Sequence, residues 1–207
     1  MNLGEIKVEA LKLMYVDYVD DLGVENLESM KADANFAGIM SAMPGAINRC
    51  FARIEDLDIL PLKSIAVQKS QCVQTENGLR LELDKIVEDF GYIDRVICED
   101  ETGYNGNHDY IMETDTTIFL PNKEKFIIVY APTLPRVLGG TDENIQIPIP
   151  NKIACLIPYF IKGDLFREDE PAEAAEARNI FESSVEAMKT KKSQRQSRIK
   201  VLFSMEG

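Results

Sequence analysis

Apolar residues recur every three to four positions at both ends of this chain and every second position in its middle. Over residues 3–17 the periodicity places Ile6, Ala10 and Met14 on one face, which predicts an amphipathic helix. Residues 26–60 continue the helical pattern and contain Pro44. Because proline lacks the N–H donor that a helix interior needs, we expect either one kinked helix here or two helices with Pro44 near the start of the second.

In the middle of the chain, apolar and polar residues alternate in short runs, and turn-forming residues separate these runs. The runs predict strands at 64–68, 79–83, 92–99, 109–113, 116–121 and 125–132. Strands this short and closely spaced are typical of a small antiparallel β-sandwich or barrel. Residues 83–91 fit either a short helix or a bulged loop.

Helical periodicity returns after residue 150. Residues 151–169 carry a broad apolar face, and Pro158 should kink that helix at Ala154, whose carbonyl loses its donor. Residues 171–192 begin with Pro171 among acidic residues and end in lysines, as expected of a helix aligned with its dipole.

The expected fold class is α+β: a helical bundle formed by the N- and C-terminal helices, with an inserted antiparallel β-sandwich or barrel and an extended C-terminal arm. The expected parts are the N-terminal helices of the bundle (1–60), the inserted β-domain (61–133), the C-terminal helices (134–192) and the arm (193–207).

The arm begins with polar and basic residues and ends in a strand-like alternation. Its candidate partner-binding residues are Arg195, Arg198, Ile199, Lys200, Val201, Leu202 and Phe203. A flexible tether that carries a strand suits pairing with the exposed edge of another sheet. The same strand could instead fold back onto the chain's own β-domain, and the alternation alone does not choose between the two.

Charge is unevenly distributed along the chain. The net charge is −12, yet residues 189–207 carry six cations against one anion, a charge of +5, so residues 1–188 carry −17. An acidic body repels nucleic acid. The basic arm either seeks an acidic partner or is a solvated tail.

The sequence contains few candidate catalytic or metal-binding residues. The four cysteines lie far apart without a CxxC pair, which indicates free thiols and neither disulfides nor a zinc site. The single histidine, His108, lies in a turn-rich stretch, and no serine or carboxylate stands in a catalytic or calcium-binding motif. We expect no enzymatic activity, cofactor or metal. The apolar runs are too short to span a bilayer and the N-terminus lacks signal-peptide features, so we also expect no membrane association and a soluble protein of the cytoplasm.

The C-terminal third resembles head-tail connector proteins, or portal adaptors, of tailed bacteriophages. The order of the parts carries most of the resemblance: a proline-bearing turn, a helix with "LIPYF", an acidic break before a proline, and a helix with "ARNIFE". The matching residues are Ile157, Pro158, Tyr159, Glu168, Asp169, Ala177, Arg178, Asn179, Phe181 and Glu182. The start of the chain and "MPGAINRCFARIE" are also similar to members with two N-terminal helices before a β insertion.

The resemblance implies a virion structural protein in the neck between portal and tail. It implies a homo-oligomeric ring of about a dozen copies that contacts the portal protein and downstream tail proteins. DNA would pass through the ring during ejection without specific binding, which suits an acidic lumen. The arm would then pair with another chain. The alternative is a binding module whose β-domain recognises a host glycan or protein through Tyr92, Tyr104 and Tyr110.

Overall fold

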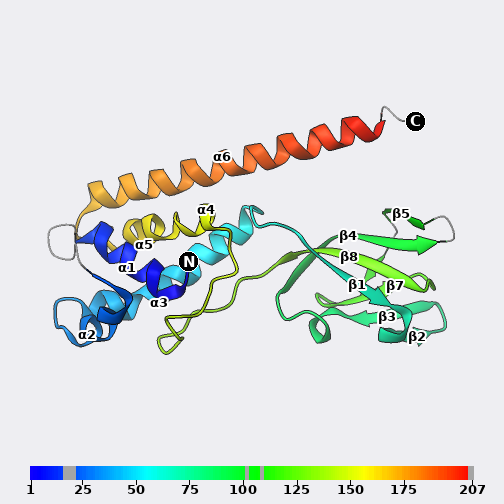
Figure 1. Ribbon diagram of the computed structural model, residues 1–207, viewed down its shortest axis with the longest axis horizontal. Coiled ribbons are helices and arrows are strands. Elements are labelled where there is room, and N and C mark those ends of the chain that lie inside the picture. Colours follow the sequence, from blue (N-terminus) through cyan, green and yellow to red (C-terminus); the bar gives the residue numbers. More distant parts are fainter. Residues whose placement is uncertain (16–21, 101–102, 108–109, 205–207) are drawn as a thin grey trace. The chain divides into compact units, whose positions relative to one another are not determined.

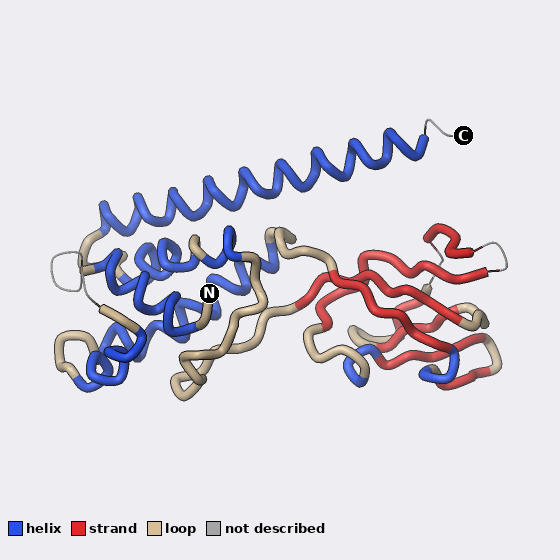
Figure 2. The backbone as a smooth tube through the Cα atoms, viewed as in Figure 1, coloured by secondary structure: helices blue, strands red, loops and turns tan. Residues whose placement is uncertain are grey.

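The computed structural model describes residues 1–15, 22–100, 103–107 and 110–204, with side chains described outside 99–109 and 190–204. The chain divides into two compact units (Figures 1 and 2). The helical unit comprises Met1–Ile59 and Leu134–Gly207, and the β unit comprises Leu60–Thr133. The fold is therefore mixed α+β, as the periodicity predicts, with helices from both ends of the chain and two antiparallel sheets between them.

The helical unit contains α1 (Leu3–Met14), the short 3₁₀ turn η1 (Val24–Asn26), α2 (Leu27–Ala32), α3 (Ala37–Asp56), α4 (Asn151–Ala154), α5 (Ile157–Leu165) and α6 (Pro171–Ser204). A capping box starts α1: the Asn2 side chain accepts from the Glu5 N–H at 2.8 Å, and Glu5 accepts from the Asn2 N–H at 2.8 Å. Helix α5 packs against α1, α3 and α6. The apolar faces of these helices form one buried core.

Proline acts differently at the two places where we expected a kink. Helix α3 runs through Pro44, and the break in this block lies earlier, between α2 and α3. There the Asp33 carboxylate accepts from the Asn35 N–H at 2.8 Å, a local turn that competes with helix. The disruption expected at Ala154 is present, but it is a break and not a kink: α4 ends at Ala154 and α5 begins at Ile157. Pro158 therefore lies in the first turn of α5, where no N–H donor is needed.

The C-terminus also differs from the expected strand. Residues 193–204 continue α6 as helix. No glycine or proline occurs between Ala172 and Glu206, and this stretch is rich in Lys, Arg, Gln and Ser, so nothing in the sequence stops a helix that began at Pro171. At 34 residues, α6 is about 50 Å long.

The β unit contains two four-stranded antiparallel sheets. One has the order β1 (Lys63–Gln68), β8 (Lys125–Pro132), β4 (Phe90–Asp100) and β5 (Gly103–Asn107). The other has the order β2 (Val73–Thr75), β3 (Gly78–Glu82), β7 (Thr117–Leu120) and β6 (Ile111–Met112). Buried residues of both sheets, among them Leu81, Val96, Ile118 and Phe126, belong to one apolar cluster.

All six strands predicted from the alternation are present, whereas β2 and β5 were not predicted. The stretch left open as helix or loop forms a short 3₁₀ turn, η3 (Leu83–Lys85). In the part of the chain that the structure describes, no helix is both long and apolar enough to cross a bilayer.

Candidate functional sites

Three of the residues on which the family resemblance rests, Arg178, Phe181 and Glu182, lie on α6 and contact α5 or α3. The rings of Phe160 on α5 and Phe181 on α6 make an edge-to-face contact at 5.0 Å between centroids. The Arg178 guanidinium lies 4.9 Å above the Phe160 ring. Glu182 is paired with Arg53 of α3 at 2.8 Å. These contacts join helices from the two ends of the chain, so their role within one copy is to stabilise the helical unit.

The segment from Leu134 to Pro150, which we call the strap, returns from the β unit and runs along the helical unit. Helix α3 holds its first part. The Glu55 carboxylate accepts from the Leu134 N–H at 2.5 Å, and the Asn48 amide bonds both backbone groups of Val137. The start of α1 holds its second part, where the Gly4 N–H donates to the Glu143 carbonyl at 2.8 Å and the Leu3 N–H to the Ile145 carbonyl at 3.0 Å.

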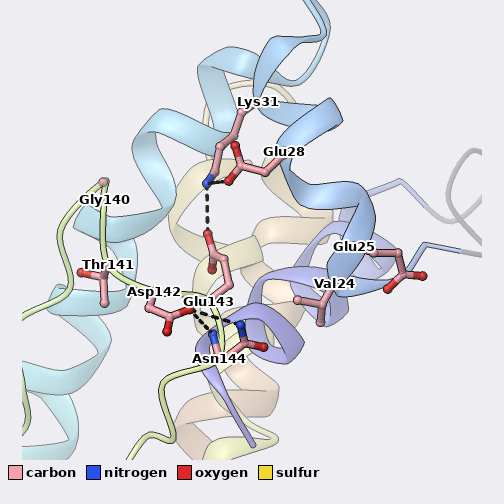
Figure 3. Close-up of a pocket in the computed structure, with 10 residues that line it drawn as sticks. Val24, Glu25, Glu28, Lys31, Gly140, Thr141, Asp142, Glu143 and Asn144 are labelled. Atoms are coloured by element: carbon pink, nitrogen blue, oxygen red, sulfur yellow. Dashed lines mark hydrogen bonds and ion pairs between the residues drawn. The ribbon is translucent and has the colours of Figure 1, made fainter.

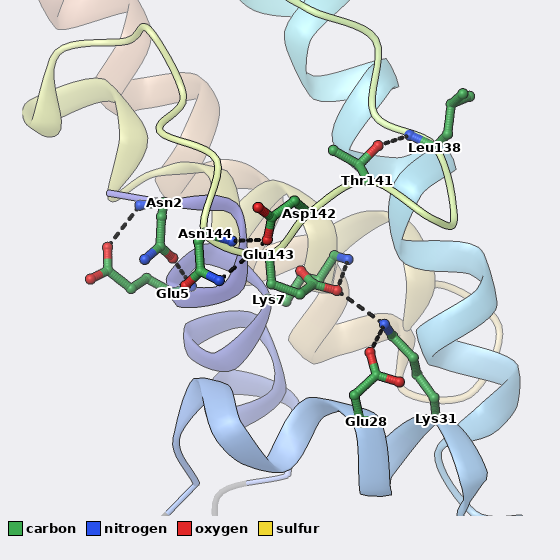
Figure 4. Close-up of polar contacts among 10 residues, drawn as sticks. All are labelled: Asn2, Glu5, Lys7, Glu28, Lys31, Leu138, Thr141, Asp142, Glu143 and Asn144. Atoms are coloured by element: carbon green, nitrogen blue, oxygen red, sulfur yellow. Dashed lines mark hydrogen bonds and ion pairs between the residues drawn. The ribbon is translucent and has the colours of Figure 1, made fainter.

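One buried ion pair fixes the middle of the strap (Figure 4). Lys7 of α1 is 1% exposed, and its ammonium lies 2.7 Å from Glu143 Oε1. The same oxygen is 3.2 Å from the Lys31 ammonium, which Glu28 approaches at 2.6 Å. The hydrogen bond to Glu28, supported by Glu143, raises the pKa of Lys31 above its usual value.

Beside this ion pair lies an open hollow of about 600 Å³ (Figure 3). Its lining comes from η1, α2 and the strap: Val24, Glu25, Glu28, Lys31, Gly139, Gly140, Thr141, Asp142, Glu143 and Asn144. The polar groups here mostly serve local structure. The Thr141 hydroxyl accepts from the Leu138 N–H at 2.8 Å, and the Asp142 carboxylate accepts from the Asn144 N–H at 3.0 Å.

The hollow offers little reactive chemistry. Its ionisable groups are four carboxylates and one lysine, and that lysine is paired with two of them. Within the described ranges, no group of three or more His, Cys, Asp or Glu side chains is arranged to hold a metal ion. The arrangement therefore anchors the strap to the helices, and it assembles no nucleophile with a base.

The cysteines are free thiols in the structure. Cys50 and Cys98 are buried, Cys72 is partly buried and Cys155 is exposed. Burial raises the pKa of the Cys50, Cys72 and Cys98 thiols, which disfavours the reactive thiolate. His108 lies outside the described residues.

Four aligned residues cross the β2–β3–β7–β6 sheet of the β unit, and we call them the apolar row because all except Arg80 are apolar. Backbone pairing aligns Val73 with Arg80, Arg80 with Phe119, and Phe119 with Ile111. Paired residues of an antiparallel sheet point to one face, and the alternate row of Leu79 and Leu120 is buried, so this row faces outward. Its two ends are the most exposed large apolar residues of the unit, Val73 at 60% and Ile111 at 69%.

The partner-binding residues predicted at the C-terminus lie on the last turns of α6, and their side chains are outside the described set. Sequence reasoning missed both the strap and the apolar row. The alternation "DYIME" predicted the strand that contains Ile111, but the three-residue strand with Val73 gave no comparable signal. The chain matches no protein-family model, and no curated protein matches it.

Proposed function

We propose that this chain is a structural subunit of the neck of a tailed bacteriophage, a head-tail connector whose copies form a ring between the portal and the tail. One observation carries the proposal. Two residues of "ARNIFE" that match the connector family contact the other segments in which the resemblance lies: Phe181 packs against Phe160 of α5, and Glu182 pairs with Arg53 of α3. A family motif whose members share one packing site is more specific than the same letters scattered over a surface.

The organisation of the chain supports the same proposal. The helical unit is built from both ends of the chain, and a β unit of antiparallel sheets, which we describe as a sandwich, interrupts it. A ring body formed by the helices would leave the β unit available for contacts with neighbours. Residues 1–188 carry −17, and an acidic lumen would let DNA pass without holding it.

The C-terminal segment has a separate role in this proposal. Residues 193–207 contain Arg195, Arg198 and Lys200 next to Ile199, Val201, Leu202 and Phe203. Opposite charge would steer the segment toward an acidic partner surface, and its apolar residues would hold it there. Because its backbone is helical in the structure, binding by strand pairing would require its last turns to unwind.

The ring is tested by mass measurement on the full chain, alone and mixed with the portal protein encoded in the same genome. We expect monomers alone and a defined multimer on the portal. Deletion of residues 193–207 should leave the fold intact and abolish portal binding. A variant with the same residues 193–207 in scrambled order keeps the charge, so it separates electrostatic steering from specific contact. A full-length chain that never associates with the portal overturns the proposal.

Recognition of a host glycan is the weaker candidate. Of the three tyrosines that could serve it, Tyr92 is exposed, Tyr110 packs against the core of the β unit, and the Tyr104 side chain lies outside the described set. The described side chains therefore do not gather an aromatic platform. We propose the ring subunit alone, without enzymatic activity, and with the virion neck as its place.

A further inference from the structure

The β2–β3–β7–β6 sheet has two open edges that carry matching surfaces. Val73 lies on edge strand β2 and Ile111 on edge strand β6, at the two ends of one row across the sheet. Edge strands present backbone N–H and C=O groups that can pair with another chain, and proteins commonly protect them with charge, with proline or by keeping them very short. Strands β2 and β6 are short, with three and two residues, yet each presents a large apolar side chain to solvent.

We propose that the β6 edge of one copy pairs with the β2 edge of a second copy, with Ile111 beside the second copy's Val73. The contact is head-to-tail, because it joins different edges of the two sheets. A head-to-tail contact leaves one edge open at each end of the pair, so it propagates to a third copy and closes into a ring when the rotation allows. Closure into a ring is the one part of this inference that rests on the proposed function; the pairing of the two edges does not.

Charge decides the direction of the pairing. An antiparallel arrangement that sets Val73 beside Ile111 brings the residues before Val73 next to those after Ile111. Lys69 then lies on the side of Glu113 and Asp115, both exposed. A parallel arrangement would instead bring Glu76 to the same two carboxylates. Opposite charge therefore favours antiparallel pairing of β6 with β2.

The symmetric alternative, in which β6 pairs with β6, lacks this charge pairing. It is also antiparallel, so it would set Glu113 and Asp115 beside the residues before Ile111 of the second copy, and no lysine or arginine lies between Cys98 and Ile111. Within one copy Glu113 is already engaged by Arg80, the one charged member of the row, at 2.6 Å. Asp115 is exposed, and the Lys69 of a second copy would pair with it in place of the exposed Glu124, which lies 3.4 Å from Lys69 within one copy.

The pairing should be weak between two free copies. Strand β2 has three residues and β6 has two, so an isolated contact adds few backbone hydrogen bonds. A template that holds many copies in one ring raises their effective concentration and makes weak contacts sufficient. Covalent trapping is therefore the appropriate readout for the protein alone.

The experiment is disulfide trapping in the full chain, in a Cys72→Ser, Cys155→Ala background that keeps the buried Cys50 and Cys98. The double variant Val73→Cys, Ile111→Cys should give a ladder of dimers, trimers and larger species under mild oxidation. The two single variants should crosslink only when mixed, and then only to dimers. The control pairs Val73→Cys with Ile145→Cys, an exposed apolar site of the helical unit, and should stay monomeric.

Two outcomes overturn the pairing. Self-crosslinking of Ile111→Cys alone would mean symmetric β6 contacts, and a double variant that crosslinks no better than the control at the solubility limit would mean that the edges do not meet. Neither result depends on portal binding. If the mass measurement finds a portal-bound multimer while trapping fails, the ring is supported and the β6–β2 interface is rejected. If trapping gives a ladder of crosslinked species but the chain does not bind the portal, the interface is supported and the proposed ring on the portal is rejected.

Discussion

Asn48 of α3 bonds both backbone groups of Val137: its amide donates to the Val137 carbonyl at 2.8 Å, and its carbonyl accepts from the Val137 N–H at 2.8 Å. The two residues lie 89 positions apart in the sequence. This paired contact gives the strap one fixed position on α3, in the same way that a neighbouring strand would satisfy an extended segment.

Asn48→Ala should therefore destabilise the helical unit. The substitution leaves a part-buried N–H and C=O of Val137 without their partner, which costs about 1–3 kcal/mol of unfolding free energy. Because the chain has no tryptophan, the measurement is denaturant unfolding followed by far-UV circular dichroism. Ser41→Ala, an exposed position on the same helix, should change little. Equal stability of the Asn48→Ala variant and the wild type would mean that the strap is not held there.

A second prediction concerns the buried ion pair. Glu143→Gln removes the carboxylate that faces Lys7, whose side chain is 2% exposed, and leaves a buried ammonium without its counter-charge. Breaking a buried pair from one side costs about 3–5 kcal/mol. Lys7→Met should cost less, because Glu143 is 14% exposed and keeps Lys31 as a partner.

A double-mutant cycle separates the pair from its surroundings. The double variant Lys7→Met, Glu143→Gln should be more stable than Glu143→Gln alone, because it no longer buries an unpaired charge. Additive costs for the two substitutions would contradict the coupling that the 2.7 Å contact predicts.

Local patterns predicted much of the fold and little of how distant segments meet. The helical stripe before Met14 and Pro171 at the start of α6 are local signals, and the structure has helices at both. The residues at which the helices end could not be predicted from local patterns. The break at Asp33 depends on a side chain that bonds its own backbone, and α6 continues past residue 192 because no residue there stops it.

The candidate sites show the same limit. Lys7 and Glu143 are 136 residues apart, and nothing near either position marks it as a buried partner. Strand β2 has three residues, too few for an alternation to be recognised, and so the row from Val73 to Ile111 is visible only once the sheet is paired. The alternation of residues 198–203 predicted a strand. Their backbone is helical instead, because they continue the helix that precedes them.

A third prediction concerns pH and the β unit. The Tyr130 hydroxyl donates to Asp89 at 3.1 Å, and Asp89 also pairs with Lys63. Burial, with the hydrogen bond to Asp89 and its charge adding to it, raises the pKa of Tyr130 to about 12 from the ordinary value of 10.0. Between these two pH values the unfolded chain has released this proton and the folded chain has kept it, so rising pH favours unfolding.

The β unit should therefore lose stability from about pH 10 to about pH 12, and Tyr130→Phe should lose less over the same range. At neutral pH the variant should be less stable by about 1.5–3 kcal/mol, the worth of a hydrogen bond to a charged acceptor. Absorbance titration of tyrosinate should show a late step near pH 12 in the wild type that is missing in the variant. The same late step in both proteins would assign it to another tyrosine.

A fourth prediction compares two glycines that both lie inside helices. At Gly163 of α5 the backbone of α6 lies close: a Cβ built there would lie 3.0 Å from the Ala174 carbonyl oxygen and 3.2 Å from Arg178 Cβ. Gly45 of α3 meets only the end of the flexible Arg49 side chain, at 3.3 Å.

Alanine should therefore have opposite effects at the two positions. Gly45→Ala should stabilise the helical unit by up to about 1 kcal/mol, because alanine has the higher helix propensity and the exposed Arg49 side chain can shift slightly while it keeps Asp164 as its partner. Gly163→Ala gains the same propensity but pushes α5 from the backbone of α6, and overpacking of this kind costs about 1–3 kcal/mol. Both variants keep the charge and nearly the same composition, so their difference in unfolding free energy isolates the close approach of the two helices. If Gly163→Ala is as stable as Gly45→Ala, α5 and α6 do not pack at this distance, and the contact between "LIPYF" and "ARNIFE" is looser than the structure has it.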